Sequence, residues 1–203
     1  MTYESIYQEI NDLLAQYHDT IPSLYRALRE QAGAWQYARG GGILHRGWYC
    51  PSPVYDMMIG GADRGRLLKD PARCKTPPDF AYGFDVHGQL IVVDGPYSSL
   101  THGPYYREAV LRERNREIGL RMDRDDRLCG ISICRYQGGR LTEYITALRL
   151  ERQSGSFTSF DREVYTYQDG CLSAAERLEH DAPSGLSRSW HYDHNGNFAI
   201  PQK

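Results

Sequence analysis

A short phrase that recurs from residue 80 onward constrains the fold of this chain more than any other feature. In its fullest form, two aromatic residues stand two positions apart, a polar residue and a glycine follow, and an apolar residue closes the phrase. Side chains two positions apart lie on the same face of a strand, and Asp-Gly or Asn-Gly supplies the positive φ that a tight hairpin needs. The phrase therefore predicts successive antiparallel hairpins. Its copies are Tyr82–Leu90, Ile133–Leu141, Tyr165–Leu172 and Trp190–Phe198.

The widest gap between copies predicts one more hairpin. The turn glycines of the first two copies, Gly88 and Gly139, lie much further apart than the later ones. Alternating apolar residues on both sides of Arg114-Asn115 favour two strands with a turn midway. Glutamate and arginine are also good helix formers, so a helix over Tyr106–Arg116 is the rival interpretation. The sequence leaves open whether residues 104–117 form a strand or a helix.

The N-terminal segment has a helical rather than an alternating periodicity. Apolar residues recur at steps of three and four over residues 3–18, and Thr2 stands where an N-cap is expected. A second helix is predicted over Pro22–Ala32, because proline suits a first helical turn and Gly33 is a natural stop.

Between the helices and the first copy of the phrase, glycine clusters predict further hairpins. Trp35–Ala38 and Ile43–Tyr49 flank three glycines and would form the two arms of the first hairpin. Together the patterns predict an α+β fold that is mainly β, with two N-terminal helices packed on a long antiparallel β-hairpin meander. We expect a single domain over residues 1–203, made of a helical segment 1–33, first hairpins 34–70 and the meander 80–203.

Composition argues against several classes of function. The formal net charge is −2, so the chain lacks the basic excess that drives nucleic-acid binding. Its apolar runs are far shorter than the about 20 residues of a membrane span, and no signal peptide opens the sequence, so we expect a cytoplasmic protein without a membrane partner. The five cysteines include no Cys-x-x-Cys pair, which favours reduced thiols over a metal or redox site.

Two clusters have the residue types of a ligand site, and each has a simpler explanation. His191, Asp193 and His194 could bind a metal ion, yet turn chemistry accounts for Asp193 and the residues that follow. Gly60–Arg66 is rich in glycine like a phosphate-binding loop, yet it lacks the closing Gly-Lys-Ser/Thr. We therefore expect no metal and no cofactor.

Catalytic residues cannot be assigned from spacing. Cys50 and His45 would form a hydrolase dyad only if the fold brought them together. His87 and His102 have tyrosines near them, and histidine and tyrosine serve as general acids and bases in β-rich enzymes. We expect no catalytic residue, and the hypothesis of a small β-rich enzyme stays open.

The hairpin phrase resembles a known kind of scaffold. The segments Tyr82–Leu90, Tyr165–Leu172 and Trp190–Phe198 are similar to the hairpin units of bacterial Rhs/YD-repeat and MORN-like proteins. The resemblance implies a non-catalytic scaffold, of the kind that β-rich immunity proteins of polymorphic toxin systems use. The spacing here is irregular and the basic residue that usually follows the turn glycine is missing, so a closed Rhs shell is not expected.

These observations favour a binding protein over an enzyme. Tyrosine, tryptophan and arginine anchor protein interfaces, and residues 161–181 hold six acids against two arginines. We expect an immunity protein that neutralises a cognate bacterial toxin by occluding its active or substrate-binding surface. The alternatives are a small β-rich enzyme, such as a toxin-type transferase or nuclease, and a structural repeat module. The predicted partner-binding residues, expected near turns, are Asp123, Asp125, Asp126, Glu163 and Asp169.

Overall fold

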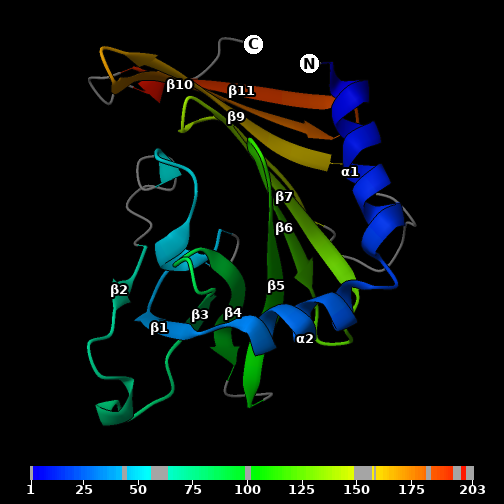
Figure 1. Cartoon of the computed structure of the whole chain (residues 1–203). Coiled ribbons are helices and arrows are strands. Elements are labelled where there is room, and N and C mark those ends of the chain that lie inside the picture. The colour runs from blue at the N-terminus through cyan, green and yellow to red at the C-terminus, as the bar shows by residue number, and fades with distance from the viewer. Residues whose placement is uncertain are drawn as a thin grey trace. The chain divides into compact units, whose positions relative to one another are not determined.

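The chain folds into two N-terminal helices followed by a series of antiparallel strands (Figure 1). The structure is a computed structural model, and it describes residues 2–42, 45–55, 64–98, 102–148, 157, 159–181, 184–193 and 198–199. The helices are α1 (Tyr3–Tyr17) and α2 (Ile21–Gln31), and short 3-10 helices cover Gly47–Tyr49 and Pro71–Arg73. The strands are β1 (Ala34–Arg39), β2 (Arg66–Leu67), β3 (Phe80–Phe84), β4 (Leu90–Ser98), β5 (Gly103–Glu113), β6 (Arg116–Met122), β7 (Leu128–Gln137), β8 (Arg140–Leu148), β9 (Ser159–Gln168), β10 (Cys171–Asp181), β11 (Leu186–Asp193) and β12 (Phe198–Ala199).

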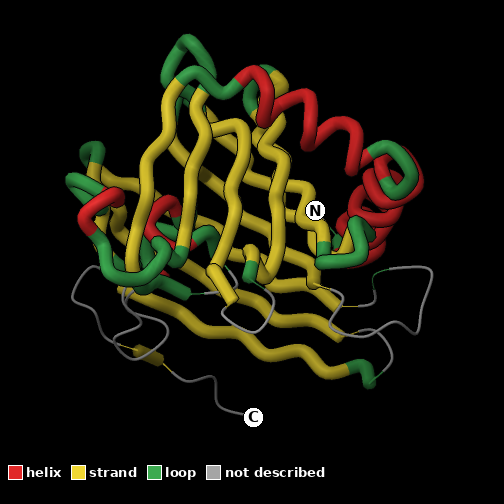
Figure 2. The backbone as a smooth tube through the Cα atoms, turned by 90° about the horizontal axis from the view of Figure 1, so that it is seen from below, coloured by secondary structure: helices red, strands yellow, loops and turns green. Residues whose placement is uncertain are grey.

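The predicted fold class is confirmed: the chain is α+β, mainly β, with one antiparallel sheet. The strands are hydrogen-bonded in the order β12-β11-β10-β9-β8-β7-β6-β5-β4-β3-β1-β2, so from β3 onward each strand lies beside its neighbour in sequence. Strands make up most of the described backbone, as Figure 2 shows in yellow. This order is the meander that successive short hairpin turns dictate.

Glycine and aspartate build the turns that the recurring phrase predicts. In the turn between β3 and β4, Asp85 Oδ1 accepts hydrogen bonds from the backbone N–H groups of His87 and Gln89. Asp169 and Gly170 both have positive φ values, 49° and 88°, in the turn between β9 and β10. The turn of the last copy lies outside the described residues, although the strands on its two sides pair.

Residues 103–113 form a strand, so the helix interpretation of this segment is wrong. Ala109 on β5 pairs with Val92 on β4, and Arg114 turns the chain with a φ of 45°. Pairing along β4 decides the conformation here, because tertiary contacts outweigh the helix propensity of glutamate and arginine.

The first predicted hairpin is wrong in its second arm. β1 pairs with β3 and β2, whereas Gly47–Tyr49 is a 3-10 helix. The Tyr82 hydroxyl on β3 causes this, because it donates to the Arg46 carbonyl (2.9 Å) and accepts from the Trp48 N–H (3.1 Å). Gly47 has a φ of 55°, and a Cβ there would lie 2.9 Å from the Phe80 and Tyr82 side chains. Part of the predicted 34–70 hairpin region, residues 43–44 and 56–63, lies outside the described residues.

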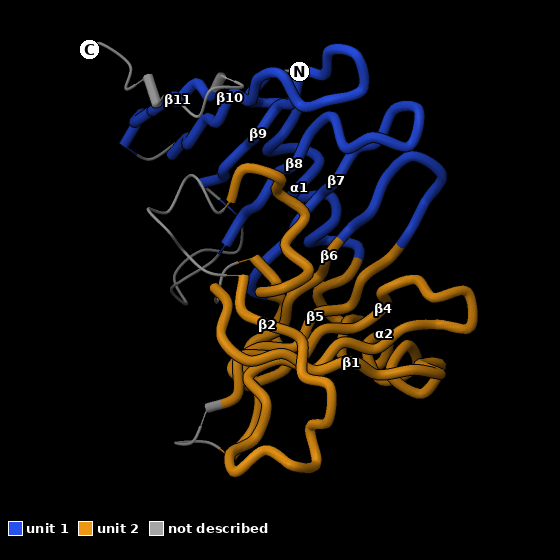
Figure 3. The backbone as a smooth tube through the Cα atoms, turned by 90° about the vertical axis from the view of Figure 1, so that its left-hand side faces the viewer, with its two compact units in different colours: residues 1–16, 112–118, 129–203 blue, residues 17–111, 119–128 orange. Residues whose placement is uncertain are grey.

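The chain divides into two compact units (Figure 3). Unit 1 comprises residues 1–16, 112–118 and 129–203, and unit 2 comprises residues 17–111 and 119–128. Strands β5, β6 and β7 contribute residues to both units.

Unit 2 has an aromatic core and a buried charged group. Phe80, Tyr82 and Phe84 pack in its core, and the α2 residue Tyr25 donates a hydrogen bond to Asp94 on β4. Glu108 is buried between Arg46 and Arg121, with Arg46 Nε 2.6 Å from Glu108 Oε1. Although burial opposes it, these two guanidinium groups hold the pKa of Glu108 below its usual range.

In unit 1, α1 packs on one face of the strands. Thr2 caps the helix as predicted, because its Oγ1 accepts a hydrogen bond from the Ser5 N–H. The apolar stripe of α1 is buried, namely Ile6, Ile10, Leu13 and Leu14. The Tyr7 hydroxyl lies 2.7 Å from His180 Nδ1 on β10, and Asn11 Oδ1 accepts from the Phe157 N–H. These contacts leave the other face of the same strands without a helix from this unit's described residues.

Candidate functional site

Strands β7 to β11 of unit 1 have two faces of different character. Residues paired directly across antiparallel strands project to the same face. Phe160 and Arg162 on β9 pair with His180 and Leu178 on β10, and this is the face that carries α1. The opposite face carries the odd-numbered residues of β9 and β10, which alternation places away from the helix.

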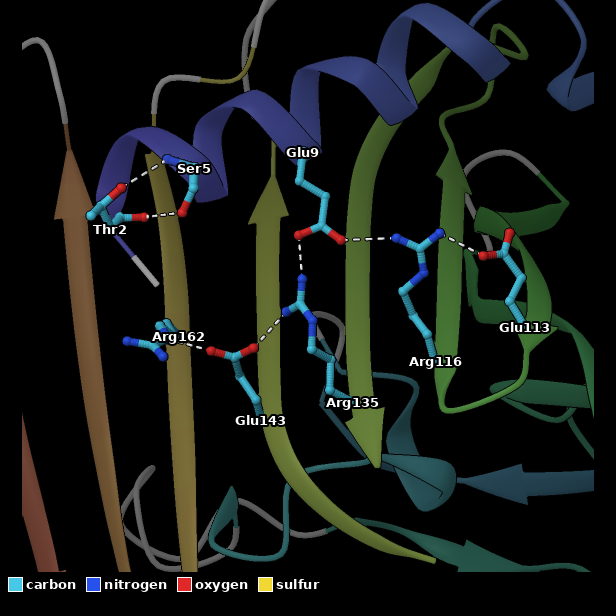
Figure 4. A network of polar contacts seen from close by, with 8 residues as sticks. All are labelled: Thr2, Ser5, Glu9, Glu113, Arg116, Arg135, Glu143 and Arg162. Carbon is cyan, nitrogen blue, oxygen red and sulfur yellow. Dashed lines mark hydrogen bonds and ion pairs between the residues drawn. The ribbon is translucent and has the colours of Figure 1, made fainter. Parts of the chain in front are cut away.

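On the α1 face, acidic and basic side chains alternate in one chain of contacts (Figure 4). Glu9 of α1 accepts hydrogen bonds from Arg116 on β6 and Arg135 on β7. Arg135 also donates to Glu143 on β8, which accepts from Arg162 Nε at 2.6 Å. Arg116 extends the chain to Glu113. Each carboxylate in this network lies beside a guanidinium group, so the network connects α1 to the strands through paired charges.

On the opposite face, one arginine is shared among several acids. Arg177 Nη2 on β10 lies 3.0 Å from Asp161 Oδ2 and 3.0 Å from Glu179 Oε1. Its guanidinium carbon lies 5.3 Å from the centre of a Trp190 ring on β11, a cation–π contact. Glu163 pairs directly opposite Arg177, and the Tyr165 hydroxyl donates a hydrogen bond to Glu163. We call this group the Arg177 cluster: Asp161, Glu163, Tyr165, Arg177, Glu179, Arg188, Trp190 and Tyr192.

A register shift in β10 assembles the Arg177 cluster. Near the turn, Cys171 pairs with Gln168 and Leu172 with Tyr167, but a bulge at Ser173 advances the register so that Ala174 pairs with Thr166. If the first register continued, Arg177 would lie opposite Arg162 on the α1 face. A slip of one residue moves every side chain of a strand to the other face. The bulge therefore brings Arg177 and Glu179 to the face of Asp161 and Glu163.

The cluster holds more acid than its cations offset. Burial raises the pKa of Asp161 even though Arg177 lowers it, and burial together with the charge of Asp161 raises the pKa of Glu179. Burial raises the pKa of Tyr192 to about 12. Although burial opposes it, the charges of Asp161 and Glu179 raise the pKa of Arg177, so its guanidinium stays charged. Arg177 therefore does not fully compensate the cost of removing the carboxylates of Asp161 and Glu179 from water.

Glu163 is the one predicted partner-binding residue that lies in the cluster. It stands in the middle of β9 with 3% of its surface exposed, so the prediction that it lies near a turn is wrong. The reason is that the acidic residues at 161 and 163 follow the two-residue period of a strand, which sequence reasoning could have applied. The same period links Arg177 to Glu179, which went unrecognised in the sequence, and Trp190 to Tyr192, which are the aromatic pair of the fourth copy of the phrase.

The predicted aspartates at 123, 125 and 126 lie in the turn between β6 and β7 of unit 2. Asp123 Oδ1 accepts hydrogen bonds from the N–H groups of Asp125 (2.9 Å) and Arg127 (3.0 Å), so it shapes the turn itself. Asp126 has a φ of 62° and accepts a hydrogen bond from Arg107. Asp125 Oδ2 lies 3.9 Å from Arg127 Nη1. Asp125 and Asp126 each lie beside an arginine side chain, and Asp123 is satisfied by backbone N–H groups, in contrast to the acids that share Arg177.

One exposed aromatic residue accompanies this turn. Tyr105 on β5 is 50% exposed, and the Arg124 guanidinium lies 5.2 Å from its ring centre. The remaining predicted residue, Asp169, lies in the exposed turn between β9 and β10 of unit 1. The positions at turns are as predicted for these four aspartates, and their part in partner binding stays a prediction.

The other candidates from the sequence are the histidines near the C-terminus, the glycine-rich segment and the Cys50–His45 pair. His191 pairs with Glu176, with His191 Nδ1 3.6 Å from Glu176 Oε1, on the face opposite the Arg177 cluster. His194 and residues 60–63 lie outside the described residues. His45 and Cys50 are both buried in unit 2. Across the described ranges, no three His, Cys, Asp or Glu side chains converge as metal ligands would, and this includes the acids of the Arg177 cluster.

No known protein family, curated protein or solved structure matches this chain. Within the described residues, neither α1 nor α2 has the length and apolar character needed to span a membrane.

Proposed function

We propose that this chain is a non-catalytic binding protein, and that the face carrying the Arg177 cluster docks on a basic surface of a partner protein. In the specific form of the proposal, the chain is an immunity protein that occludes the active or substrate-binding surface of a cognate bacterial toxin. The observation that carries the proposal is the excess of carboxylates around Arg177 on a face that α1 leaves uncovered.

The composition of the cluster suits an interface. Arginine, tyrosine and tryptophan contribute most of the energetic anchors of protein interfaces, and the cluster has all three types on neighbouring strands. Asp161 and Glu179 have side chains that are 32% and 36% exposed, so a partner can reach them. An acidic patch also speeds the approach of a basic partner and repels nucleic acid.

A second candidate is a small β-rich enzyme that uses the same residues. The raised pKa values of Asp161 and Glu179 favour it, because a carboxyl group with a raised pKa is suited to act as a general acid. The binding function is preferred because Arg177 already bonds to both carboxylates.

The test is co-purification of a partner with tagged protein from the source organism, followed by identification of the partner. We expect a stoichiometric protein partner that survives moderate salt and is lost with the double substitution D161N/E179Q. The matched control is D12N/E30Q, which removes one aspartate and one glutamate at exposed positions of α1 and α2. Retention of the partner by D161N/E179Q would remove the cluster from the interface. Inhibition of the partner's activity by the wild-type chain would support the immunity role.

A further inference from the structure

The Arg177 cluster displays how it binds a guanidinium group, because it already holds one. Arg177 donates from a single nitrogen, Nη2, to both Asp161 Oδ2 and Glu179 Oε1. Its guanidinium also lies against the Trp190 ring. Two carboxylates on adjacent strands and an aromatic face are the groups that recognise arginine, whose planar fork of donors fits carboxylates and stacks on rings.

Half of this recognition surface is still available. Among the described residues, Asp161 Oδ1 and Glu179 Oε2 accept no hydrogen bond. Asp161 and Glu179 pair directly across β9 and β10, so the two side chains lie on the same face, and both are partly exposed. Ionised carboxylates each offer about four acceptor positions, so one shared nitrogen leaves most of this capacity unused.

The charges around the two carboxylates also favour a second cation. Glu163 pairs with Arg177 from the neighbouring position on β9, so three carboxylates face Arg177 and Arg188. Arg188 pairs with Glu179 across β10 and β11. Because the Arg188 side chain is exposed, water screens its attraction to the Glu179 carboxylate. An incoming guanidinium would bring a second positive charge to Asp161 and Glu179, whose contacts with Arg177 use one oxygen of each carboxylate.

We propose that the face binds an arginine side chain of the partner protein, placed between the free oxygens of Asp161 and Glu179 beside Arg177, with the Trp190 ring as its stacking surface. This inference rests on the proposed function, because it names the group by which the partner is recognised. Lysine fits less well, since an ammonium is a compact charge that cannot bridge two carboxylates in a planar fork or stack on indole as a guanidinium does.

The experiment uses the full chain with the substitutions W35F and W48F, so that Trp190 is the only tryptophan that reports. The probe is a tripeptide with blocked ends and a central arginine between glycines, and the comparison probe carries lysine instead. At low salt, we expect a saturable change of Trp190 fluorescence with the arginine peptide and affinity several-fold weaker with the lysine peptide. The substitutions D161N/E179Q should weaken the affinity for the arginine peptide by about tenfold or more, as expected for the loss of hydrogen bonds to a charged group.

A second variant keeps the test informative if D161N/E179Q fails to fold. Arg188 is exposed and competes for Glu179, so R188Q should tighten binding of the arginine peptide by about two- to fivefold. Equal affinity for the two peptides, or unchanged affinity in both R188Q and a folded D161N/E179Q, would overturn the inference. If the chain does not prefer the arginine peptide, while binding of the natural partner still depends on the cluster, the proposed function stands without arginine recognition. If the peptide binds as expected but no protein partner depends on the cluster, the proposed function falls and the arginine site remains.

Discussion

The two faces of strands β7 to β10 use the same residue types for different ends. On the α1 face, Glu9, Arg135 and Glu143 alternate so that each charge has an opposite charge as its neighbour. On the other face, Arg177 alone bonds to Asp161 and Glu179. A count of ion pairs would therefore treat the two faces alike, whereas the number of carboxylates that share one guanidinium group distinguishes them.

The face on which a charge lies is decided by strand register and not by its position in the sequence. Arg162 and Glu163 are adjacent in the chain, yet Arg162 joins the α1 network while Glu163 joins the Arg177 cluster. Alternation separates them on β9, and the bulge at Ser173 decides which residues of β10 each of them meets.

Insertion of one alanine between Ser173 and Ala174 should have the largest effect on the two faces. If the inserted residue takes the place opposite Thr166, every later residue of β10 moves by one position, so Arg177 would lie opposite Arg162 and both faces would lose their pairing of charges. We expect β10 and β11 to lose stable pairing, measured as loss of amide hydrogen-exchange protection in residues 174–193.

The control for this insertion is Ser173→Ala, which keeps the bulge and removes only the hydrogen bond from Ser173 Oγ to the Thr166 carbonyl. It should retain near wild-type protection, because the hydroxyl is exposed. Protection of β10 and β11 that survives the insertion would contradict the role given to the register beyond the bulge.

Arg177→Met should have the next largest effect. The methionine fills part of the volume, but Glu163, Asp161 and Glu179 lose the cation that they share. Breaking a largely buried ion pair leaves uncompensated charge, so the free energy of unfolding should fall by about 3 kcal/mol in urea titrations at neutral pH. Arg26→Met on the exposed side of α2 is the control, with an expected change within about 0.5 kcal/mol. A loss no larger than that of the control would show that the acids of the cluster do not need Arg177.

Glu9→Gln tests the other face and should have a smaller effect. Glu9 bonds to both Arg116 and Arg135, but these arginine side chains are 33% and 23% exposed and keep contacts with Glu113 and Glu143. The free energy of unfolding should therefore fall by about 1–2 kcal/mol, and by less in high salt. The exposed Asp12→Asn on the same helix should change it by no more than about 0.5 kcal/mol. A loss equal to that of Arg177→Met would erase the distinction between the two faces.

The sequence predicted the strands far better than it predicted the site. Two-residue alternation and glycine turns are local signals, so the hairpins of β3–β4, β7–β8 and β9–β10 were found from residues 82–90, 133–141 and 165–172. The second arm of the first hairpin failed because the Tyr82 hydroxyl holds the backbone of residues 46–48 from a distant strand. Contacts of that range leave no local pattern.

The Arg177 cluster escaped prediction for a related reason. Strand spacing in the sequence places Asp161, Glu163 and Tyr165 on one face, but the partner residues on β10 depend on a bulge that has no sequence signature here. Acids were instead chosen by their proximity to turns, which selected Asp123, whose carboxylate bonds to its own turn. The face of each strand, together with the register between the strands, would have been needed to find the residues of the Arg177 cluster.

Asp161→Asn should have the smallest effect, and its sign separates the cluster from an ordinary ion pair. Because burial raises the pKa of Asp161 above its ordinary 3.8, the folded chain binds this proton more tightly than the unfolded chain does. The resulting stabilisation is complete below pH 3.8 and is lost as the pH rises through the raised value. Asparagine resembles the protonated form, so the variant should melt slightly above wild type at pH 7 and no higher near pH 3.

Glu108→Gln in unit 2 is the opposite case: Arg46 and Arg121 lower the pKa of Glu108 against the effect of burial, so its stabilisation is present above pH 4.5 and lost on acidification. That variant should melt well below wild type at pH 7. If Asp161→Asn also melted well below wild type at pH 7, Asp161 would be fully compensated by Arg177, and the cluster would have no excess charge for a partner to neutralise.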